Sequence, residues 1–375
     1  MSQTAEGQAA DPVPAKATKA YGVRDAEAAL APMTIERRAV GARDVAIRID
    51  WCGICHTDIH IARDDWGGSK YPVVPGHEIV GTVTAVGAEV AGHAVGDRVG
   101  VGCMVASCKA CGACEDGDEQ FCEVRTVMTY GSDGPASDGP VSGGPVSGGH
   151  THGGYSSDIV VREDFVLRVP EGLDPKGVAP LLCAGITTYS PLRRWGVGEG
   201  DKVGIVGLGG LGHMGVKFAR AMGARVVMIT TSPEKAGDAG RLGADEVLVS
   251  KDPDQMKRHA GSFDFILNTV PVPHPLNPYL DLLARNGTMV IVGAIEAFDG
   301  VHSGGLVRGR KRLAGSLIGG IAETQEMLDF CGEHGIASDV EVTDMRDVNA
   351  AWARVVNGDV RYRFVIDMAT LRAAA

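Results

Sequence analysis

The sequence predicts an α/β protein that joins a β-rich part to a doubly wound parallel sheet. Three observations lead to this prediction. At 375 residues the chain is too long for one ordinary hydrophobic core. Short segments rich in alternating or β-branched residues fill the first half, whereas strand-like and helix-like segments alternate after Pro180. Repetition of strand, helix and strand is typical of a parallel sheet with helices on both faces.

The first half is expected to consist of short strands and turns. Asp44–Asp50 alternates apolar and polar residues, and Ile79–Val86 is rich in β-branched residues. A Gly96-Asp97 turn precedes a third short strand, Val99–Val101. No long helical period is evident before about residue 175.

Two segments of this half lack the composition of a core. Residues 1 to about 20 have few large apolar side chains, and we expect a loose tail there. Gly131–Gly149 repeats Ser-Asp-Gly-Pro and Val-Ser-Gly-Gly, which predicts a mobile surface excursion. The alternative for this excursion is a lid over a site.

The second half is expected to alternate strands with helices. Helices are predicted at about Leu211–Met222 and at Glu323–His334, and a closing strand at Tyr362–Met368 would return to the first half. The strands predicted for the parallel sheet are Lys202–Val206, Arg225–Ile229, Glu246–Val249, Phe263–Leu267 and Thr288–Val292.

Composition excludes several classes of partner. The chain has 36 Lys and Arg against 47 Asp and Glu, a net charge of −11, so its field repels phosphate backbones and anionic lipid. No nucleic acid and no membrane are therefore expected as partners. The longest apolar stretches, such as Thr288–Ile295, fall short of the roughly 18 residues of a membrane helix. The N-terminus has no apolar signal core, which favours the cytoplasm, where clustered cysteines indicate metal sites rather than disulfides.

A glycine loop follows the first strand of the second half. Gly207-Leu208-Gly209-Gly210-Leu211-Gly212 fits G-x-G-x-x-G between a predicted strand and a predicted helix, the setting of a dinucleotide site. Gly207 permits the tight turn, Gly209 allows approach of the pyrophosphate, and Gly212 allows close helix–strand packing.

The end of the next strand indicates which dinucleotide binds. Thr230, Thr231, Ser232 and Lys235 stand where an acid would repel a 2′-phosphate, which favours NADP(H). A solvated turn capped by Ser232 is compatible with this interpretation. Glu234 directed at the ribose would instead favour NAD.

Two groups of cysteine and histidine residues indicate metal. Four thiols lie within a short segment with C-x-x-C-x-x-C spacing; they are Cys108, Cys111, Cys114 and Cys122. Four thiolates saturate tetrahedral zinc and predict a structural site, with an iron–sulfur cluster as the alternative.

The second group is dispersed over Cys55-His56-Thr57-Asp58, His77-Glu78 and Cys183. A Cys52-x-x-Cys55 redox pair is the alternative for its first segment, which lacks a thioredoxin-type setting. Cys52, Cys103 and Cys331 are expected to pack as small apolar residues.

Taken together, these segments resemble the zinc-dependent medium-chain alcohol dehydrogenases, specifically the cinnamyl alcohol dehydrogenase branch with its bacterial NADP-dependent relatives. The resemblance extends from about Tyr21 to Asp367. It depends on G-I-C-H-T-D-I-H from Gly53, Y-P-V-V-P-G-H-E-I-V-G from Tyr71, the four cysteines, G-G-Y-S from Gly153, P-L-L-C-A-G-I-T from Pro180, G-L-G-G-L-G-H-M-G from Gly207 and G-S-L-I-G-G from Gly315.

The resemblance implies a GroES-like catalytic domain interrupted by a Rossmann domain. The catalytic domain would comprise 1–178 and 318–375, with the structural-zinc lobe at about 103–125, and the Rossmann domain 179–317. The resemblance further implies a homodimer joined through the Rossmann sheets. It also implies two Zn²⁺ ions per chain, one structural and one catalytic.

The site residues implied by the resemblance have separate roles. Cys55, His77 and Cys183 would hold the catalytic zinc, with Asp58 orienting His77 and Glu78 approaching the ion during ligand exchange. Thr57 and His60 would relay the alcohol proton to water. The cofactor contacts carried over are Thr187, the loop Gly207–Gly212, Thr230, Thr231, Ser232, Lys235, Thr269, Gly293, Ser316, Leu317, Ile318 and, as a looser match at the pyrophosphate, Arg363.

The expected activity is interconversion of primary alcohols and aldehydes with NADP(H). Met128 stands where plant members have an aromatic residue, and a flexible thioether wall favours varied aromatic and medium-chain aliphatic substrates. A zinc-dependent polyol or sugar dehydrogenase is one alternative, but Trp66, Met128 and Leu317 indicate an apolar pocket. A non-catalytic zinc- or NADPH-binding module is the other, and it should lack the relay or the ligand triad.

Overall fold

The computed structural model describes residues 14–133, 149–293, 296–298 and 300–373, and these form two compact units. The first unit consists of Met1–Leu182, Gly320–Gln325 and Val340–Ala375, and the second of Cys183–Gly319 and Glu326–Asp339. The chain thus passes from the first unit to the second and back twice. Residues 326–339, within the range expected for the first domain, pack with the second unit because the Phe330 ring lies 5.5 Å from that of Tyr189.

The first unit is organised around a seven-stranded, mainly antiparallel sheet. Its strand order is β16-β17-β3-β4-β5-β9, with β8 also paired to β3, so the C-terminal strand β17 lies beside the long strand β3. Ile47 and Ile49 on β3 are almost completely buried, which agrees with the alternation seen in the sequence. Two-stranded ribbons, β1-β2 and β6-β7, complete the β structure described for this unit.

The elements of the first unit are short, as its sequence predicts. Its strands are β1 (Lys16–Gly22), β2 (Ala31–Arg37), β3 (Asp44–Gly53), β4 (Ile79–Val86), β5 (Arg98–Val101), β6 (Met104–Ala106), β7 (Val127–Met128), β8 (Asp158–Arg162), β9 (Leu167–Arg168), β16 (Val340–Asp344) and β17 (Arg363–Asp367). Its helices are α1 (His56–Ala62), α2 (Gly112–Glu115), α3 (Pro175–Val178), α11 (Val348–Val356) and α12 (Ala369–Ala373).

The expectation of a loose tail up to about residue 20 is wrong for its last part. Strand β1 begins at Lys16 and pairs antiparallel with β2 along its whole length. Thr18 and Ala20 are each 1% exposed, so small side chains are sufficient to hold this edge ribbon against the unit. Residues 1–13, and most of the predicted Gly131–Gly149 excursion (134–148), lie outside the described residues.

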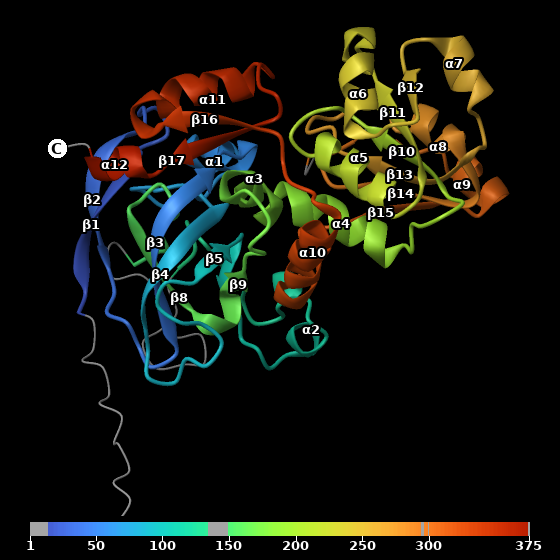
Figure 1. Cartoon of the computed structure of the whole chain (residues 1–375). Coiled ribbons are helices and arrows are strands. Elements are labelled where there is room, and N and C mark those ends of the chain that lie inside the picture. The colour runs from blue at the N-terminus through green and yellow to red at the C-terminus, as the bar shows by residue number, and fades with distance from the viewer. Residues whose placement is uncertain (1–13, 134–148, 294–295, 299, 374–375) are drawn as a thin grey trace, which may run out of the picture. The chain divides into compact units, whose positions relative to one another are not determined.

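The second unit contains the predicted parallel sheet. Its six strands run β12-β11-β10-β13-β14-β15, and every pair is parallel (Figure 1). The order reverses between β10 and β13, and ligands of open α/β sheets bind where the strand order reverses, at the carboxyl ends of the strands. The strands are β10 (Lys202–Val206), β11 (Arg225–Thr230), β12 (Glu246–Val249), β13 (Phe263–Asn268), β14 (Leu283–Ile291) and β15 (Arg312–Gly315).

Helices alternate with these strands. They are α4 (Ala184–Arg194), α5 (Gly212–Ala221), α6 (Ala236–Leu242), α7 (Pro253–Arg258), α8 (Asn277–Leu282) and α9 (Ser303–Gly309). Helix α10 (Ile321–His334) begins in the first unit and ends in the second. None of the helices in the described part of the chain combines the length and apolar character needed to cross a bilayer.

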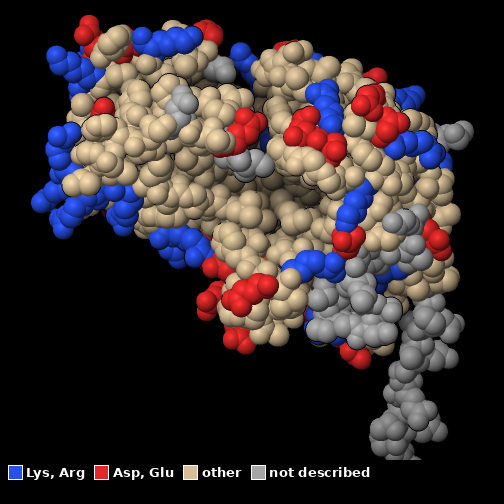
Figure 2. Space-filling model, turned by 180° about the vertical axis from the view of Figure 1, so that it is seen from behind, with Lys and Arg blue, Asp and Glu red and all other residues tan. Residues whose placement is uncertain are grey.

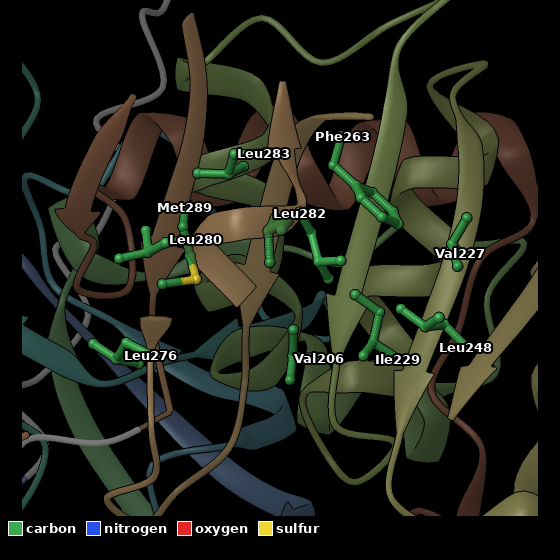
Figure 3. Packing of buried hydrophobic residues seen from close by; sticks show 11 residues of the cluster. Val206, Val227, Ile229, Leu248, Phe263, Leu276, Leu280, Leu282, Leu283 and Met289 are labelled. Atoms are coloured by element: carbon green, nitrogen blue, oxygen red, sulfur yellow. The ribbon is translucent and has the colours of Figure 1, made fainter. Parts of the chain in front are cut away.

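A buried cluster of apolar side chains holds this sheet together. Figure 3 shows Val227 and Ile229 of β11 with Leu248 of β12, and Phe263 and Met289 further along the sheet. All five are completely buried. Strands buried on both faces are nearly continuous apolar runs, and this burial agrees with the parallel sheet that the repetition of strand, helix and strand predicted.

Candidate active site

The dispersed cysteine and histidine residues converge. One ligand atom each from Cys55, His77, Glu78 and Cys183 lies within 4.8 Å of the others. Cys55 precedes α1, His77 and Glu78 precede β4, and Cys183 directly follows Leu182, which is 1% exposed. Segments that are far apart in sequence therefore present two sulfurs, one imidazole and one carboxylate at one place.

Asp58 organises this cluster from within α1. It is fully buried, and its carboxylate accepts the N–H groups of Cys55 and Gly76, each at 2.9 Å. The same carboxylate lies 3.2 Å from Nδ1 of His77. A hydrogen bond at Nδ1 leaves Nε2 of His77 free to bind a metal ion. This geometry fits the orienting role predicted for Asp58.

Glu78 faces the cluster as a buried acid. One carboxylate oxygen accepts from the Arg363 guanidinium, and the other, Oε2, has no hydrogen-bond partner. Burial raises the pKa of Glu78 to about 7, although the Arg363 charge opposes that shift. A Cβ at Gly53 would lie 1.9 Å from Oε2, so only glycine leaves room for this carboxylate.

These donors fit a zinc ion. Two thiolates and one imidazole are the soft and borderline ligands that zinc prefers, and three protein ligands are typical of catalytic rather than structural sites. Glu78, whose Oε2 has no partner, adds a nearby carboxylate that can replace another ligand of the ion.

Arg363, predicted as a loose pyrophosphate contact, is 7% exposed and paired with Glu78 in this structure.

The predicted relay residues lie on α1. The Thr57 hydroxyl lies 3.6 Å from the Cys55 sulfur. Nδ1 of His60 lies 2.8 Å from a carboxylate oxygen of Asp65, and the His60 ring stacks on Trp66 at 4.8 Å. The His60 side chain is 34% exposed, so it can exchange protons with water.

The four-cysteine lobe forms a second, separate cluster. The sulfur atoms of Cys108, Cys111, Cys114 and Cys122 lie within 4.8 Å of one another. The Cys108 and Cys114 sulfurs are 3.9 Å apart, and so are those of Cys111 and Cys122. Two ligands about 2.3 Å from one ion at tetrahedral positions would be about 3.8 Å apart, so this spacing fits zinc.

Backbone groups prepare the lobe for thiolates. The Cys122 sulfur accepts N–H groups from Cys108 and Arg125, each at 3.4 Å. Burial raises the pKa of the Cys122 thiol, but these N–H groups outweigh it and lower that pKa to about 6. The other three cysteines, Cys52, Cys103 and Cys331, are buried, as small apolar residues would be.

The glycine loop has the geometry of a dinucleotide site. Gly207 has a φ of +93°, which the turn requires. A Cβ at Gly212 would lie 1.8 Å from the Gly207 carbonyl oxygen, whereas a Cβ at Gly209 would meet no protein atom within 4 Å. The hydroxyl of Thr269 donates to the carbonyl of Val206 at 2.8 Å and so ties β13 to the start of the loop.

The remaining predicted cofactor residues lie in the second unit, most of them at carboxyl ends of its strands. Thr230 ends β11, and its hydroxyl accepts the Ser232 N–H at 3.1 Å. Thr231, between these two residues, is exposed. Gly293 approaches the Thr269 backbone so closely that a Cβ would lie 2.4 Å from it. Thr187 is 8% exposed on α4. The Lys235 side chain lies outside the described part of the chain.

The segment after β15 has an unusual backbone. The N–H of Ser316 donates to the Ile291 carbonyl, and Ile318 has a φ of +37°. Leu317 between them is 51% exposed. Two further large apolar side chains of the predicted pocket, Trp66 at 45% and Met128 at 39%, are also exposed.

Two residues near these sites were missed by sequence reasoning. Asp65 fixes the His60 ring, and the buried Tyr130 ring stacks on that of His77 at 5.7 Å. Asp65 lies in the turn after α1, where no residue spacing in the sequence indicates a contact with His60. Tyr130 borders a glycine-rich segment that resembles an ordinary loop in sequence.

Comparisons with known proteins agree with this geometry. Residues 41–171 match the model of the alcohol dehydrogenase GroES-like domain, and residues 210–333 that of the zinc-binding dehydrogenase family. The chain is 54% identical to the aldehyde reductase YahK of Escherichia coli (strain K12) over 361 residues, 94% of this chain and 99% of that protein.

Two solved structures are similar over nearly the whole chain. A cinnamyl alcohol dehydrogenase from Sorghum bicolor has a TM-score of 0.88 and 46% identity, covering 94% of this chain and 98% of its own. A cinnamyl alcohol dehydrogenase from Helicobacter pylori, complexed with NADP(H), has a TM-score of 0.85 and 39% identity, covering 96% and 99%.

Proposed function

The chain belongs to the zinc-dependent medium-chain alcohol dehydrogenases, in their cinnamyl alcohol dehydrogenase branch, and from this we propose how its residues perform the reaction. It is an oxidoreductase that interconverts alcohols and aldehydes and uses zinc and NADP(H). The observation that supports the proposal most strongly is the convergence of Cys55, His77 and Cys183 beside the buried Glu78.

The catalytic zinc would be held by Cys55, His77 and Cys183. When bound there, zinc polarises a carbonyl or lowers the pKa of an alcohol, and the nicotinamide ring donates or accepts the hydride. Asp58 keeps His77 in the tautomer that can bind the ion, through its contact at Nδ1. Glu78, with one unpartnered oxygen, can approach the ion when the other ligands exchange.

The alcohol proton would leave through Thr57 and His60. The Thr57 hydroxyl lies 3.6 Å from the Cys55 sulfur and would accept the proton, and His60, on the same helix, would pass it on. The Asp65 carboxylate accepts a hydrogen bond from Nδ1 of His60, so Nε2 is the nitrogen that would take up and release the transferred proton. The exposed edge of His60 releases the proton to water.

The finer features of the enzyme are proposed on the same basis. A second zinc, bound by the four cysteines of the lobe, would give two ions per chain, since both clusters have a suitable donor set. The thiolates of both sites need reducing conditions, which supports a cytoplasmic location. The edge strand β15 would join two chains into a homodimer, as the family resemblance implies.

The substrates would be aromatic and medium-chain aliphatic aldehydes and primary alcohols. Trp66, Met128 and Leu317 are exposed apolar side chains that can accept such groups. Polyols and sugars need several hydrogen-bonding groups, which these three side chains do not offer.

The test is a panel of aldehydes, alcohols and polyols assayed with NADPH and with NADH, together with a metal count. Aromatic aldehydes should be reduced with NADPH at the highest kcat/KM, and elemental analysis should find two zinc ions per chain. A clear preference for NADH would contradict the cofactor proposal. Active protein with one ion, confined to the four-cysteine lobe, would contradict the mechanism.

A further inference from the structure

A buried acid links the four-cysteine lobe to the start of α10. Glu119 lies between Cys114 and Cys122 and is 3% exposed. Its Oε2 accepts the N–H of Ile321, the first residue of α10, at 3.0 Å, and its Oε1 accepts from Nζ of Lys109 at 2.7 Å. Figure 1 shows α2 of the lobe beside this end of α10.

The contact with α10 supplies what the helix end lacks. The first N–H groups of a helix have no partner within the helix, and they carry a partial positive charge. A carboxylate from another segment therefore caps the helix in the way that an N-cap side chain does. Glu119 performs this for α10 from about 200 residues away in sequence.

A close backbone approach at the same place also joins α10 to the lobe. A Cβ at Gly320, directly before α10, would lie 1.6 Å from the carbonyl oxygen of Gly117 in the lobe. The backbones of Gly320 and Gly117 are therefore in direct contact, and any larger residue at position 320 would push α10 away from the lobe.

The lobe in turn fixes Glu119. The Glu119 carbonyl accepts the N–H of Cys122 at 3.2 Å and the hydroxyl of Thr126 at 2.8 Å. Lys109, its ion-pair partner, directly follows Cys108. Since Glu119 is flanked and paired by residues next to the four thiols, its position depends on the geometry of the lobe.

The chain that enters α10 leads directly from the proposed cofactor site. Ser316–Ile318 would border the nicotinamide under the proposed function, and Gly319 and Gly320 connect them to Ile321. Ile318 has a φ of +37°, which is rare for a β-branched residue, so this stretch is strained. One end is β15, and the other is the first turn of α10.

We infer that Glu119 is a positioning residue, through which the four-cysteine lobe sets the backbone that binds NADP(H). The lobe thereby acts on cofactor affinity and not only on stability. This inference depends on the proposed function, because it takes Ser316–Ile318 as cofactor contacts. It adds that loosening the link at Glu119 weakens NADP(H) binding while both metal sites remain filled.

The test compares Glu119→Ala, Glu119→Gln and Glu115→Ala. Glu119→Ala removes both contacts, and Glu119→Gln retains an oxygen for the Ile321 N–H but loses the charge. Glu115 is an exposed acid of the same lobe and supplies the matched control. Three quantities are measured: metal content, amide hydrogen exchange at Ile321 and Ala322, and the Kd for NADPH from fluorescence titration.

We expect Glu119→Ala to retain two metals, to exchange the Ile321 amide faster and to bind NADPH about tenfold more weakly, since a charged hydrogen bond is lost. Glu119→Gln should lie between Glu119→Ala and the natural chain, and Glu115→Ala should match the natural chain. The kcat at saturating NADPH should change less than the KM for NADPH. Gly320→Ala, whose Cβ would crowd both the Gly117 carbonyl oxygen and Oε2 of Glu119, should give the same pattern.

Other outcomes overturn the inference. An unchanged Kd for NADPH in Glu119→Ala would show that the link does not affect the cofactor. Loss of the lobe metal in that variant would show that Glu119 only stabilises the lobe. If the natural chain itself fails to bind NADPH, the proposed function is wrong, and the exchange rates still report on the Glu119 contact.

Discussion

Asp58 and Glu78 show how two buried carboxylates in one site acquire different roles. Asp58 accepts two backbone N–H groups and faces Nδ1 of His77, so its negative charge is used to orient a ligand. Glu78 has one oxygen on Arg363 and the other without a partner, and its pKa is raised to about 7 by burial. A satisfied carboxylate positions its neighbours, whereas an unsatisfied one can bind a cation.

His60 and Asp65 allow the proton relay to be tested. His60→Gln should lower kcat by about 10²-fold near neutral pH, because a general acid–base group is lost. Asp65→Asn should give a smaller loss, because the ring keeps a partner at Nδ1 but loses the charge beside it. Steady-state rates measured between pH 6 and 10 give both effects. The metal content is the control: if His60→Gln empties the catalytic site, the relay assignment is wrong.

Among the elements, the strand–loop–helix unit β10–α5 combines two kinds of glycine. Gly212 is needed for the packing of the fold, because a side chain there would clash with the Gly207 carbonyl oxygen. Gly209 has open space around it, so its lack of a side chain serves a ligand rather than the fold. The sequence motif alone does not show which glycine is needed for packing and which for ligand binding, whereas the structure does.

This difference predicts opposite results for two alanine substitutions. Gly212→Ala should lower the free energy of unfolding by about 1–3 kcal/mol, as overpacking does, and should also weaken NADPH binding. Gly209→Ala should change the free energy of unfolding by less than about 0.5 kcal/mol, as at an open site, yet weaken NADPH binding strongly. Urea unfolding and fluorescence titration measure the two quantities. Tight NADPH binding by Gly209→Ala would contradict the proposed loop function.

A polar cluster at the amino ends of the same sheet is sensitive to acid. His259 lies between Lys202, 2.9 Å from its Nδ1, and Glu246, 3.0 Å from its Nε2. Burial lowers the pKa of His259 below 6.5, and the Lys202 charge lowers it further. Four other polar or charged groups surround these three, namely Ser262 and Asp264 at Lys202, Arg225 at Glu246, and Arg258 near His259.

The pH dependence follows from this arrangement. The folded protein binds the His259 proton less readily than the unfolded chain, so the stabilisation is complete above pH 6.5 and is lost as the pH falls through the folded pKa. The Tm should therefore fall less between pH 7 and pH 5 in His259→Gln, which can still donate to Glu246 and accept from Lys202 without titrating. The exposed His302→Gln is the control and should follow the natural chain. Identical slopes for all three proteins would contradict this role of His259.

At the scale of the whole molecule, the charge and the edge strands bear on the proposed homodimer. On the face shown in Figure 2, acidic and basic side chains are interspersed, except at one edge where Lys and Arg gather. The net charge of −11 repels similar chains at long range, so a dimer needs a local apolar contact. Strand β15 is an edge of its sheet, and Val307 on the preceding helix α9 is 75% exposed.

We therefore expect the proposed homodimer to depend on Val307. Sedimentation equilibrium should give twice the chain mass for the natural protein, and Val307→Glu should shift it towards one chain, because the acid would be buried without a partner. Val124→Glu alters a side chain that is 70% exposed in the four-cysteine lobe and should leave the mass unchanged. A monomeric natural protein would contradict the proposed dimer.

Much of the architecture could be predicted because its signals are local. Strands β4, β10 and β12 begin and end where the sequence predicts, and the other predicted strands differ by a few residues at their ends. The error at the tail up to residue 20 arose because β1 is held by pairing with β2, which its own composition does not show. Hydrophobic periodicity predicts segments that are buried, but not those that are held mainly by a neighbour's backbone.

The sequence by itself determined the fold class, the family and the chemical identity of every candidate ligand, because these depend on residue type and order along the chain. Tertiary structure alone brought Cys183 to Cys55 and His77, placed Asp65 on His60 and Arg363 on Glu78, and set Glu119 against α10. These contacts join residues whose spacing along the chain follows no periodicity. Only the folded backbone brings such residues within hydrogen-bonding or ligand distance.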